Sequence, residues 1–378
     1  MICPVCKTEC DNKPICPECA FEQVTFEQVG WIELENWLET VVKPYRENYL
    51  KTRTADFSIE DGVLVKYTGK APVVYVPEGV TAIGVEAFCE NGITTEVFLP
   101  PTVKEIHKYA FSCCKSITCI HLPGSLESIA FGAFECCDKL SIHLPNSVSY
   151  LEGGFCLGAV SITVDGDNPR YSVQDGFLVD KKNAVLLHCW SKENVLHVPD
   201  GVKHIGVFAF PEIDLPHRVL VLPEGVECIN GDIGGRFDRI AIPSTLRYIE
   251  EGALKKVRKF LIKSDNSYFE IRQFCVIEKA TNSLIAPRDR MTRKCTVPEG
   301  VVTITESAFS GCSKLRYVVL PESVSSVGYG AFEFCNSLEH IFCDFEDNSK
   351  KWNDHWNMCC NASVYWKGDW FYEPVPVK

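Results

Sequence analysis

The sequence predicts a solenoid of α/β type, mixed but rich in β-structure, over most of its 378 residues. The main observation is a pattern that runs twice without interruption between Leu99 and Pro145. Its apolar residues return after 23 residues from Leu99 to Leu122 and after 22 residues from Pro123 to Pro145. A fixed period of this length indicates stacked units, none of which can bury its apolar face alone. A hydrophobic content of 46% is ample for such a core.

The first predicted element is a small zinc ribbon over residues 1–22. Two Cys-x-x-Cys pairs let two tight turns present four thiolates to one ion, which completes a tetrahedral zinc shell. The predicted ligands are Cys3, Cys6, Cys16 and Cys19. Four cysteines leave no open coordination position, so the zinc is predicted to be structural and to stabilise a segment that has no core of its own. Cys10 is the weaker candidate, which could replace Cys6 or Cys16.

The ribbon resembles the short zinc ribbons at the front of many bacterial proteins, and that resemblance implies binding of nucleic acid or protein. Its acidic residues outnumber Lys7 and Lys13, which favours a docking or folding module. The whole chain has a formal net charge of -12 and a pI near 5.3. Sequence-independent binding to phosphates depends on clustered lysine and arginine, so nucleic acid is disfavoured as the main partner.

Residues 23–56 are predicted to form a helical linker and N-terminal cap. Apolar residues recur there at steps of three and four, which predicts an amphipathic helix from about Glu33 to Tyr49, with a kink near Pro44. The face that carries Trp37 is expected to cover the first open rung of the solenoid. A helix that binds a partner is the alternative.

The solenoid itself is predicted over residues 57–378. Further copies of the pattern follow or precede the tandem pair, and the last two copies are complete. They start at Pro77, Pro199, Pro223, Pro243, Pro298 and Pro321.

These residues resemble the BspA-like leucine-rich repeat family of bacterial proteins. The family unit is close to Leu-Pro-x-x-Val-x-x-Ile-x-x-x-Ala-Phe-x-x-Cys-x-x-Leu-x-x-Ile, and the resemblance runs from about Phe57 to the C-terminus. It implies a curved leucine-rich repeat array with a short strand per repeat on its concave side. Two departures stand out: Asn91 replaces the repeat cysteine, and Gly231, Gly234 and Gly235 replace an Ala-Phe pair.

Three inserts interrupt the period, at 57–75, 161–197 and 260–296. The first two contain Asp61-Gly62 and Asp175-Gly176 between alternating apolar residues, which predicts β-hairpins that extend the sheet. The third insert has Arg272-Gln273 at this place, so a different turn is expected there.

The aromatic tail is predicted to be a C-terminal cap, with an exposed ligand platform as the alternative. Its residues are Trp352, Trp356, Val364, Tyr365, Trp366, Trp370 and Phe371.

Four cysteines share one column of the repeat, where an inward side chain can satisfy backbone groups of the turn, and they are predicted to be buried, reduced thiols. They are Cys114, Cys137, Cys312 and Cys335. Reduced thiols point to a reducing compartment. With no apolar run of about 18 residues and no charged-then-apolar leader, we expect a cytoplasmic protein with no membrane span; the cell surface is the alternative.

In a strand written Ile-x-Leu, the middle residue points away from the core. This rule predicts an interaction surface on the concave face. Its residues are Phe98, Cys119, His121, Ser141, His143, Val221, Tyr317, Val319, His340 and Phe342. A metal held by Cys119, His121 and His143 is the alternative use, but no fourth ligand is evident.

No Ser/His/Asp or Cys/His set has a local signature of nucleophilic catalysis, so the chain is not expected to be an enzyme. The leading hypothesis is a non-enzymatic scaffold that binds a protein or peptide. The alternatives are a zinc-ribbon regulator associated with nucleic acid and, through the family resemblance, a surface adhesin that binds a host or matrix protein. The partner and the oligomeric state are left open.

Overall fold

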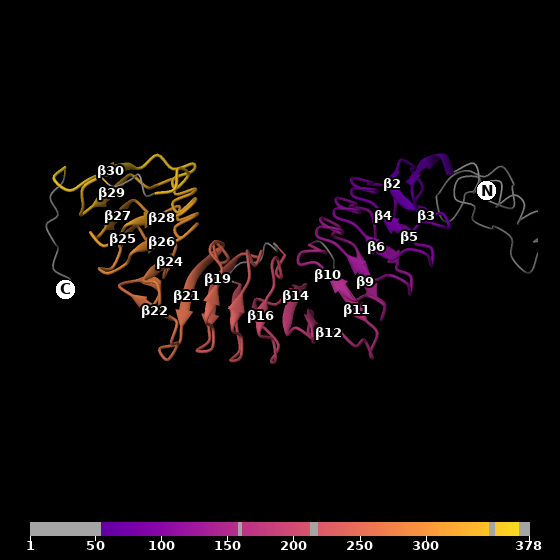
Figure 1. The fold of residues 1–378 in the computed structure, drawn as a ribbon, viewed down its shortest axis with the longest axis horizontal. Coiled ribbons are helices and arrows are strands. Elements are labelled where there is room, and N and C mark those ends of the chain that lie inside the picture. Colours follow the sequence, from indigo (N-terminus) through magenta and orange to yellow (C-terminus); the bar gives the residue numbers. More distant parts are fainter. Residues whose placement is uncertain (1–53, 158–160, 212–217, 348–351, 370–378) are drawn as a thin grey trace, which may run out of the picture. The chain divides into compact units, whose positions relative to one another are not determined.

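The computed structural model describes residues 54–157, 161–211, 218–347 and 352–369. The predicted zinc ribbon and the predicted amphipathic helix lie outside these ranges. The chain divides into two compact units, one that ends at Gly176 and one that begins at Phe177. Each unit is a β-solenoid in which the strands of successive repeats lie side by side (Figure 1).

In the first unit, each repeat contributes one strand to each of two sheets. The first sheet contains β1 (Phe57–Glu60), β2 (Val63–Tyr67), β4 (Ala82–Ile83), β6 (Glu105–Ile106), β8 (Ser128–Ile129) and β10 (Tyr150–Leu151), in that order. The second sheet contains β3 (Val73–Tyr75), β5 (Glu96–Phe98), β7 (Cys119–His121), β9 (Ser141–Leu144) and β11 (Ser161–Val164). The strand β12 (Tyr171–Gln174) is the last strand of this unit in chain order and belongs to neither of these two sheets. Apart from the antiparallel pair β1 and β2, the pairings within these two sheets are parallel.

The second unit continues the same plan. The first-sheet strands are β13 (Phe177–Asp180), β14 (Val185–Cys189), β16 (His204–Ile205), β18 (Cys228–Ile229) and β20 (Tyr248–Ile249), followed after a break by β22 (Phe269–Arg272), β23 (Cys275–Glu278), β24 (Ser283–Pro287), β26 (Thr303–Ile304) and β28 (Ser326–Val327). The second-sheet strands are β15 (Val195–His197), β17 (Val219–Val221), β19 (Phe237–Ile242) and β21 (Val257–Ile262), followed by β25 (Lys294–Thr296), β27 (Tyr317–Leu320), β29 (His340–Cys343) and β30 (Ser363–Tyr365).

The repeat positions explain the core. The isoleucine of Val-x-x-Ile lies in the first sheet, where Ile106 pairs with Ile129, and the first residue of Ile-x-Leu lies in the second, where Val97 pairs with Ile120. All four side chains are buried. The phenylalanines of the Ala-Phe steps stack on one another from rung to rung. The ring centroids of Phe88 and Phe111 lie 4.8 Å apart, and those of Phe111 and Phe134 lie 5.7 Å apart. Each rung therefore completes the core of its neighbour.

The expectation of a mixed α/β solenoid is wrong, because the described residues contain no α-helix and only a short 3-10 turn at Thr54–Asp56. The Ala-Phe segments form turns instead. In one of them the Ala110 N–H donates to the His107 carbonyl, whereas the Phe111 N–H donates to Ala133 of the next rung at 2.8 Å. Tyr109, which lies between His107 and Ala110, has a φ of 59°. These segments use their N–H groups between rungs, so the repeated i to i−4 bonds of an α-helix do not form.

The cysteine column lies inside the turns, as predicted. Cys114, Cys137 and Cys335 are at most 1% exposed, and each thiol donates to a backbone carbonyl of the preceding rung at 3.0 to 3.1 Å. Asn91 takes over this role in its own rung, since its amide nitrogen donates to Gly69 and its oxygen accepts from Thr94. Cys312 is also buried.

The first hairpin forms as predicted, with Asp61 and Gly62 both at positive φ between β1 and β2. Asp175 and Gly176 adopt the same left-handed conformations. The expectation of a different turn in the third insert is wrong. Arg272 pairs with Cys275, so Gln273 and Phe274 form a two-residue loop with φ values of 45° and 67°. The strand register imposes this type I′ geometry even though neither residue favours it.

The described part of the aromatic tail serves two purposes. Trp352 is buried, and its ring centroid lies 5.2 Å from that of Trp356 and 5.5 Å from that of Trp366, so these rings pack on the core of the last repeats. Tyr365 instead lies on the outer face of β30, next to Phe342. Trp370 and Phe371 lie outside the described residues.

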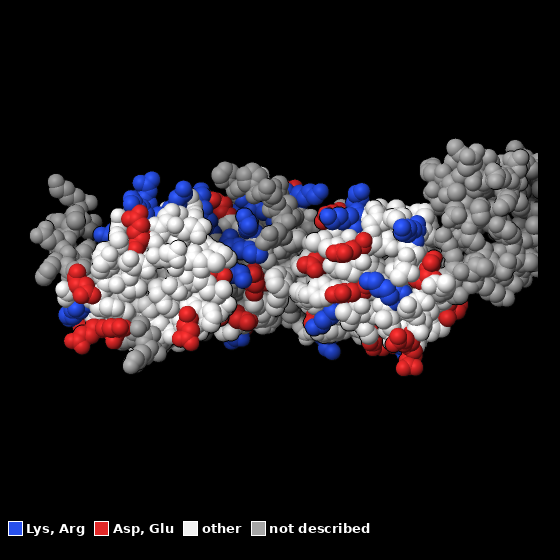
Figure 2. Space-filling view, turned by 90° about the horizontal axis from the view of Figure 1, so that it is seen from above, with Lys and Arg blue, Asp and Glu red and all other residues white. Residues whose placement is uncertain are grey.

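Acidic residues outnumber basic residues on the first unit, and some of these charges form ion pairs between rungs. On the side seen in Figure 2, acidic and basic side chains lie interspersed on this unit. Lys104 pairs with Glu127 at 3.0 Å, and Lys108 with Glu152 at 3.6 Å. Within the described ranges, no helix has the length and apolar character that crossing a membrane requires.

Candidate functional site

The ten residues predicted from the Ile-x-Leu rule all lie on strands of the second sheets. Each one is half-buried or exposed, whereas its immediate neighbours along the strand point into the core. In the first unit they occupy β5, β7 and β9; in the second unit they occupy β17, β27 and β29. At each of these ten positions, the side chain therefore points away from the core, as the alternation rule predicts.

In the first unit, three aromatic rings form a continuous stack across neighbouring strands. Tyr75 stacks on Phe98 at 4.6 Å with planes 8° apart, and Phe98 stacks on the His121 imidazole at 3.9 Å and 6°. Tyr75 was not predicted as a member of this face. The signal was present, because Val73-Val74-Tyr75 precedes Pro77 as Glu96-Val97-Phe98 precedes Pro100.

A polar cluster adjoins this stack. The His121 Nε2 atom lies 2.7 Å from the Glu96 Oε1 atom, and the Cys119 Sγ atom lies 3.6 Å from the same nitrogen. Burial and the Glu96 charge raise the pKa of the Cys119 thiol. Ligand atoms of these three side chains all lie within 4.8 Å of one another, so their arrangement could hold a metal ion.

His143 does not join that cluster. Its two ring nitrogens lie 3.0 Å from the Thr163 hydroxyl and 3.1 Å from the Asp165 carboxylate. The structure therefore brings Cys119 and His121 together, as weighed from the sequence, but replaces His143 with Glu96. Ser141, the register partner of Cys119, accepts a hydrogen bond from the Ser161 hydroxyl at 3.0 Å.

In the second unit, four rings meet on β27, β29 and β30; we call Tyr317, His340, Phe342 and Tyr365 the aromatic cluster. His340 lies 5.7 Å from Tyr317 and 5.4 Å from Tyr365, and Phe342 stacks on Tyr365 at 5.4 Å. Parallel pairing produces this contact because Phe342 is the register partner of both Val319 and Tyr365. The remaining predicted residue, Val221 on β17, is half-buried.

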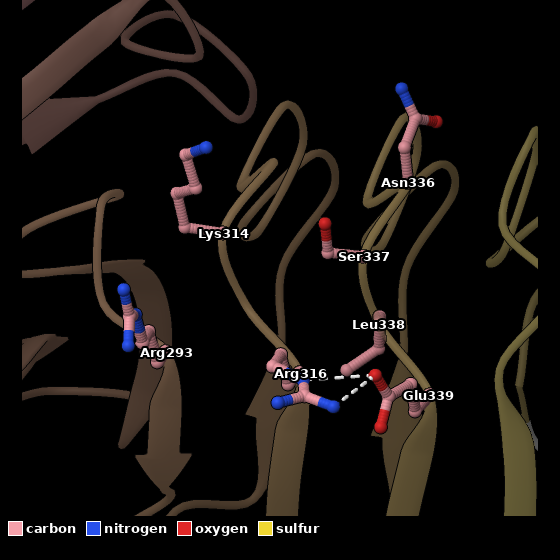
Figure 3. Close-up of a pocket in the computed structure, with 7 residues that line it drawn as sticks. All are labelled: Arg293, Lys314, Arg316, Asn336, Ser337, Leu338 and Glu339. Atoms are coloured by element: carbon pink, nitrogen blue, oxygen red, sulfur yellow. Dashed lines mark hydrogen bonds and ion pairs between the residues drawn. The ribbon is translucent and has the colours of Figure 1, made fainter.

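A hollow of about 560 Å³ borders the aromatic cluster (Figure 3). It is lined by Arg293, Lys314, Arg316, Asn336, Ser337, Leu338 and Glu339. Arg293, Arg316 and Glu339 each stand one residue ahead of a strand, so parallel stacking aligns them. Three cations and one carboxylate give the hollow a positive balance.

One of the three cations is already paired. Arg316 donates twice to one oxygen of Glu339, at 2.8 and 2.6 Å, and Tyr317 donates its hydroxyl to the other oxygen at 3.2 Å. These hydrogen bonds, led by those from Arg316, hold the pKa of Glu339 below its ordinary value. No acidic side chain among the described residues pairs with Arg293 or Lys314.

The hollow was not predicted from the sequence, because the Ile-x-Leu rule considers only residues within strands and the residues of the hollow precede the strands. The usable signal was that Arg293 and Arg316 occupy the same offset in consecutive repeats. The predicted ligands Cys3, Cys6, Cys16 and Cys19, and the alternative ligand Cys10, lie outside the described residues.

The repeats match a known family profile. The profile of the BspA type leucine-rich repeat region matches residues 64–164 and 288–362, in six copies. The chain is therefore similar to BspA-type leucine-rich repeats over part of each unit. No curated protein matches this chain.

Solved structures extend the likeness to the fold. The crystal structure of a leucine-rich repeat protein from Eubacterium ventriosum is 18% identical, with a TM-score of 0.52; the match covers 73% of this chain and 83% of that one. The pneumococcal vaccine antigen PcpA is 16% identical over 80% of this chain and 86% of its own, with a TM-score of 0.39. A leucine-rich cell surface protein from Faecalibacterium prausnitzii is 17% identical over 81% and 96%, with a TM-score of 0.32. The first of these shows the leucine-rich repeat fold.

Proposed function

We propose that this chain, which is similar to BspA-type leucine-rich repeats, is a non-enzymatic scaffold that binds a protein or peptide through the outer faces of its second sheets. The observation that carries the proposal is the aromatic cluster on β27, β29 and β30. Aromatic side chains dominate the energetics of protein interfaces because they bury much apolar area with few rotatable bonds. Four such rings on one rigid sheet form a prearranged anchor.

The neighbouring hollow indicates the chemistry of the partner. Arg293 and Lys314 present positive charge beside the cluster, and an arginine side chain can hold a carboxylate through two parallel hydrogen bonds. We therefore expect a partner segment in which an apolar or aromatic side chain stands close to an aspartate, a glutamate or a C-terminal carboxylate. Such a segment would cover the rings and place its acid in the hollow.

The test is a titration of a captured partner against wild type and Phe342→Ala. Loss of a central anchor is expected to cost about 1 to 3 kcal/mol of binding free energy, which corresponds to roughly 5- to 150-fold in affinity. Tyr248→Ala is the control, because Tyr248 is an exposed ring on the first sheet and should leave affinity unchanged.

Salt dependence separates this proposal from its alternatives. If apolar area carries most of the affinity, the affinity should change little between low and high salt. The modest salt-dependent part should disappear in Arg293→Gln. A steep fall with salt, together with no effect of Phe342→Ala, would reject the proposal in favour of a nucleic-acid regulator. A host or matrix protein as the captured partner would identify the adhesin alternative instead.

A structural zinc held by Cys3, Cys6, Cys16 and Cys19 is the second part of the proposal. Its support is the spacing of the two Cys-x-x-Cys pairs, which suits a closed tetrahedral site. Metal analysis of the purified full chain should find this zinc and should find it lost from Cys3→Ser with Cys16→Ser. An unchanged zinc content in that double variant would reject the assignment. Thiolate ligands also require a reducing environment, in agreement with a proposed cytoplasmic location.

A further inference from the structure

We propose that Glu96, Cys119 and His121 form a metal site on the first unit, which binds a divalent cation such as Zn²⁺ through one carboxylate oxygen, one thiolate and one imidazole nitrogen. This site is separate from the cysteine quartet and does not depend on the proposed partner binding. It uses the three ligand types that zinc prefers.

Strand geometry brings the three ligands together. Glu96 on β5 and Cys119 on β7 are register partners in a parallel pair, so their side chains stand next to each other. His121 follows Cys119 by two residues, so the pleat places both on the outer face. The backbone of two paired strands, rather than a mobile loop, therefore holds all three ligands.

The distances between ligand atoms are close to what a tetrahedral zinc requires. With Zn–S near 2.3 Å and Zn–N or Zn–O near 2.0 Å, neighbouring ligand atoms stand about 3.3 to 3.6 Å apart. The Cys119 Sγ atom and the His121 Nε2 atom are 3.6 Å apart. The Glu96 oxygen is 2.7 Å from the same nitrogen, so it must retreat by roughly 0.6 Å when the ion replaces their hydrogen bond.

The imidazole is held by its neighbour. The His121 ring lies flat on Phe98 at 3.9 Å, with planes 6° apart, while its Nε2 atom faces Glu96. A ring fixed in this plane loses little rotational freedom on binding a metal, which favours binding. Binding also requires the Cys119 thiol to release its proton to solvent, because the thiolate is the ligand.

Three protein ligands leave one coordination position open. Zinc sites of this kind complete their shell with water or with a donor from another molecule. His143 is not that donor, since its nitrogens face Thr163 and Asp165. The open position faces solvent, because His121 is exposed and Glu96 is half-exposed.

The experiment measures zinc protection of Cys119 in the full-length protein. The rate at which each cysteine is alkylated is read by mass spectrometry, with and without added Zn²⁺, so that metal bound by the N-terminal quartet does not obscure the result. Zinc is expected to slow alkylation of Cys119 at least tenfold in wild type. Cys228, which is also half-buried, is the internal control and should react at the same rate in both conditions.

Two variants complete the design. Glu96→Gln and His121→Ala each remove one ligand and should reduce or abolish the protection of Cys119, while circular dichroism shows that both are folded. Glu96→Gln alters only a partly exposed side chain, so it keeps the test valid if His121→Ala fails to fold. Unchanged alkylation of Cys119 with zinc, equal slowing of Cys228, or full protection in Glu96→Gln would each overturn the proposal.

Discussion

The thiol of Cys137 donates a hydrogen bond to the carbonyl oxygen of Phe111 on the preceding rung, at 3.1 Å. Both residues are fully buried, so neither group can turn to water instead. The same bond recurs from Cys114 to Phe88 and from Cys335 to Phe309. The carbonyls of Phe111, Phe88 and Phe309 also accept backbone N–H groups, from Cys114, Asn91 and Cys312 respectively. The thiol therefore gives each buried oxygen a second hydrogen bond, which contributes to stability.

The first prediction tests this bond by Cys137→Ala. The substitution removes the thiol donor from the Phe111 carbonyl, which keeps the Cys114 N–H, and opens a small cavity. We therefore expect a loss of about 1 to 3 kcal/mol in the free energy of unfolding. Urea denaturation followed by tryptophan fluorescence measures it. Cys136→Ala is the matched control, because the neighbouring Cys136 is exposed and should change stability by less than about 0.5 kcal/mol. Equal effects of the two substitutions would contradict the role of the bond.

The second prediction concerns thiol reactivity in the native protein. Burial raises the pKa of Cys114 to about 12, and it raises the pKa of Cys137 further. Because the thiolate is the reactive form, neither should react with a thiol reagent at pH 8 before denaturation. Cys359, which is exposed, should react at once.

Peptide mapping of the labelled protein identifies the residues that react. Full labelling after denaturation should need no reductant. A requirement for prior reduction would show disulfides and would move the protein out of a reducing compartment.

The third prediction concerns the two-residue turn at Gln273 and Phe274. Both residues adopt left-handed conformations, and the Phe274 side chain is 75% exposed, so packing does not compensate the strain. Replacing both residues with the Asn-Gly pair that type I′ turns favour should stabilise the protein by about 1 to 2 kcal/mol. Phe274→Ala removes the ring but keeps the Cβ atom and should gain little. If Phe274→Ala stabilises the protein as much as the Asn-Gly replacement does, exposed apolar area rather than backbone strain is the cause.

The fourth prediction is a pH dependence from His188. Burial lowers the pKa of this imidazole to about 4, against about 6.5 in an unfolded chain. The unfolded chain therefore binds a proton more readily, so stability is present above pH 6.5 and declines as the pH falls toward 4. Between pH 7 and pH 5 the loss should be about 2 kcal/mol.

Urea denaturation at the two pH values measures this loss. His188→Gln should reduce the difference between pH 7 and pH 5, even if it is less stable at both. His204→Gln, which alters a half-buried histidine on β16, should keep the wild-type difference. A difference that persists unchanged in His188→Gln would assign the pH dependence to other groups.

Much of this fold could be predicted because the repeat presents the same residue type at the same offset many times. The outward position of Phe342 and the inward position of Cys335 both follow from alternation and period alone. The family resemblance implied one short strand per repeat. It did not reveal that the Val-x-x-Ile steps form a second sheet, because two-residue strands such as Glu105–Ile106 are too short to show alternation.

The misses have physical causes as well. Alanine and phenylalanine give no turn signal, so the turn around Phe111 was not predicted; contacts between rungs decide its conformation. The strand register, not residue preference, decides the turn at Phe274. Glu96 was missed as a possible ligand because it lies 23 residues before Cys119, and only parallel pairing of adjacent rungs makes them neighbours.

The bonding of each rung to the next makes the length of this chain adjustable in whole steps. Deletion of Pro100–Leu122 would join Leu99 to Pro123 and recreate the Leu-Pro junction that now stands at Leu99-Pro100 and Leu122-Pro123. The columns of phenylalanine and cysteine would close up in phase, and the stack would shorten by one strand spacing, about 4.8 Å. Unequal recombination between repeats could therefore lengthen or shorten such a protein during evolution, and change which side chains its faces display, without requiring a new fold.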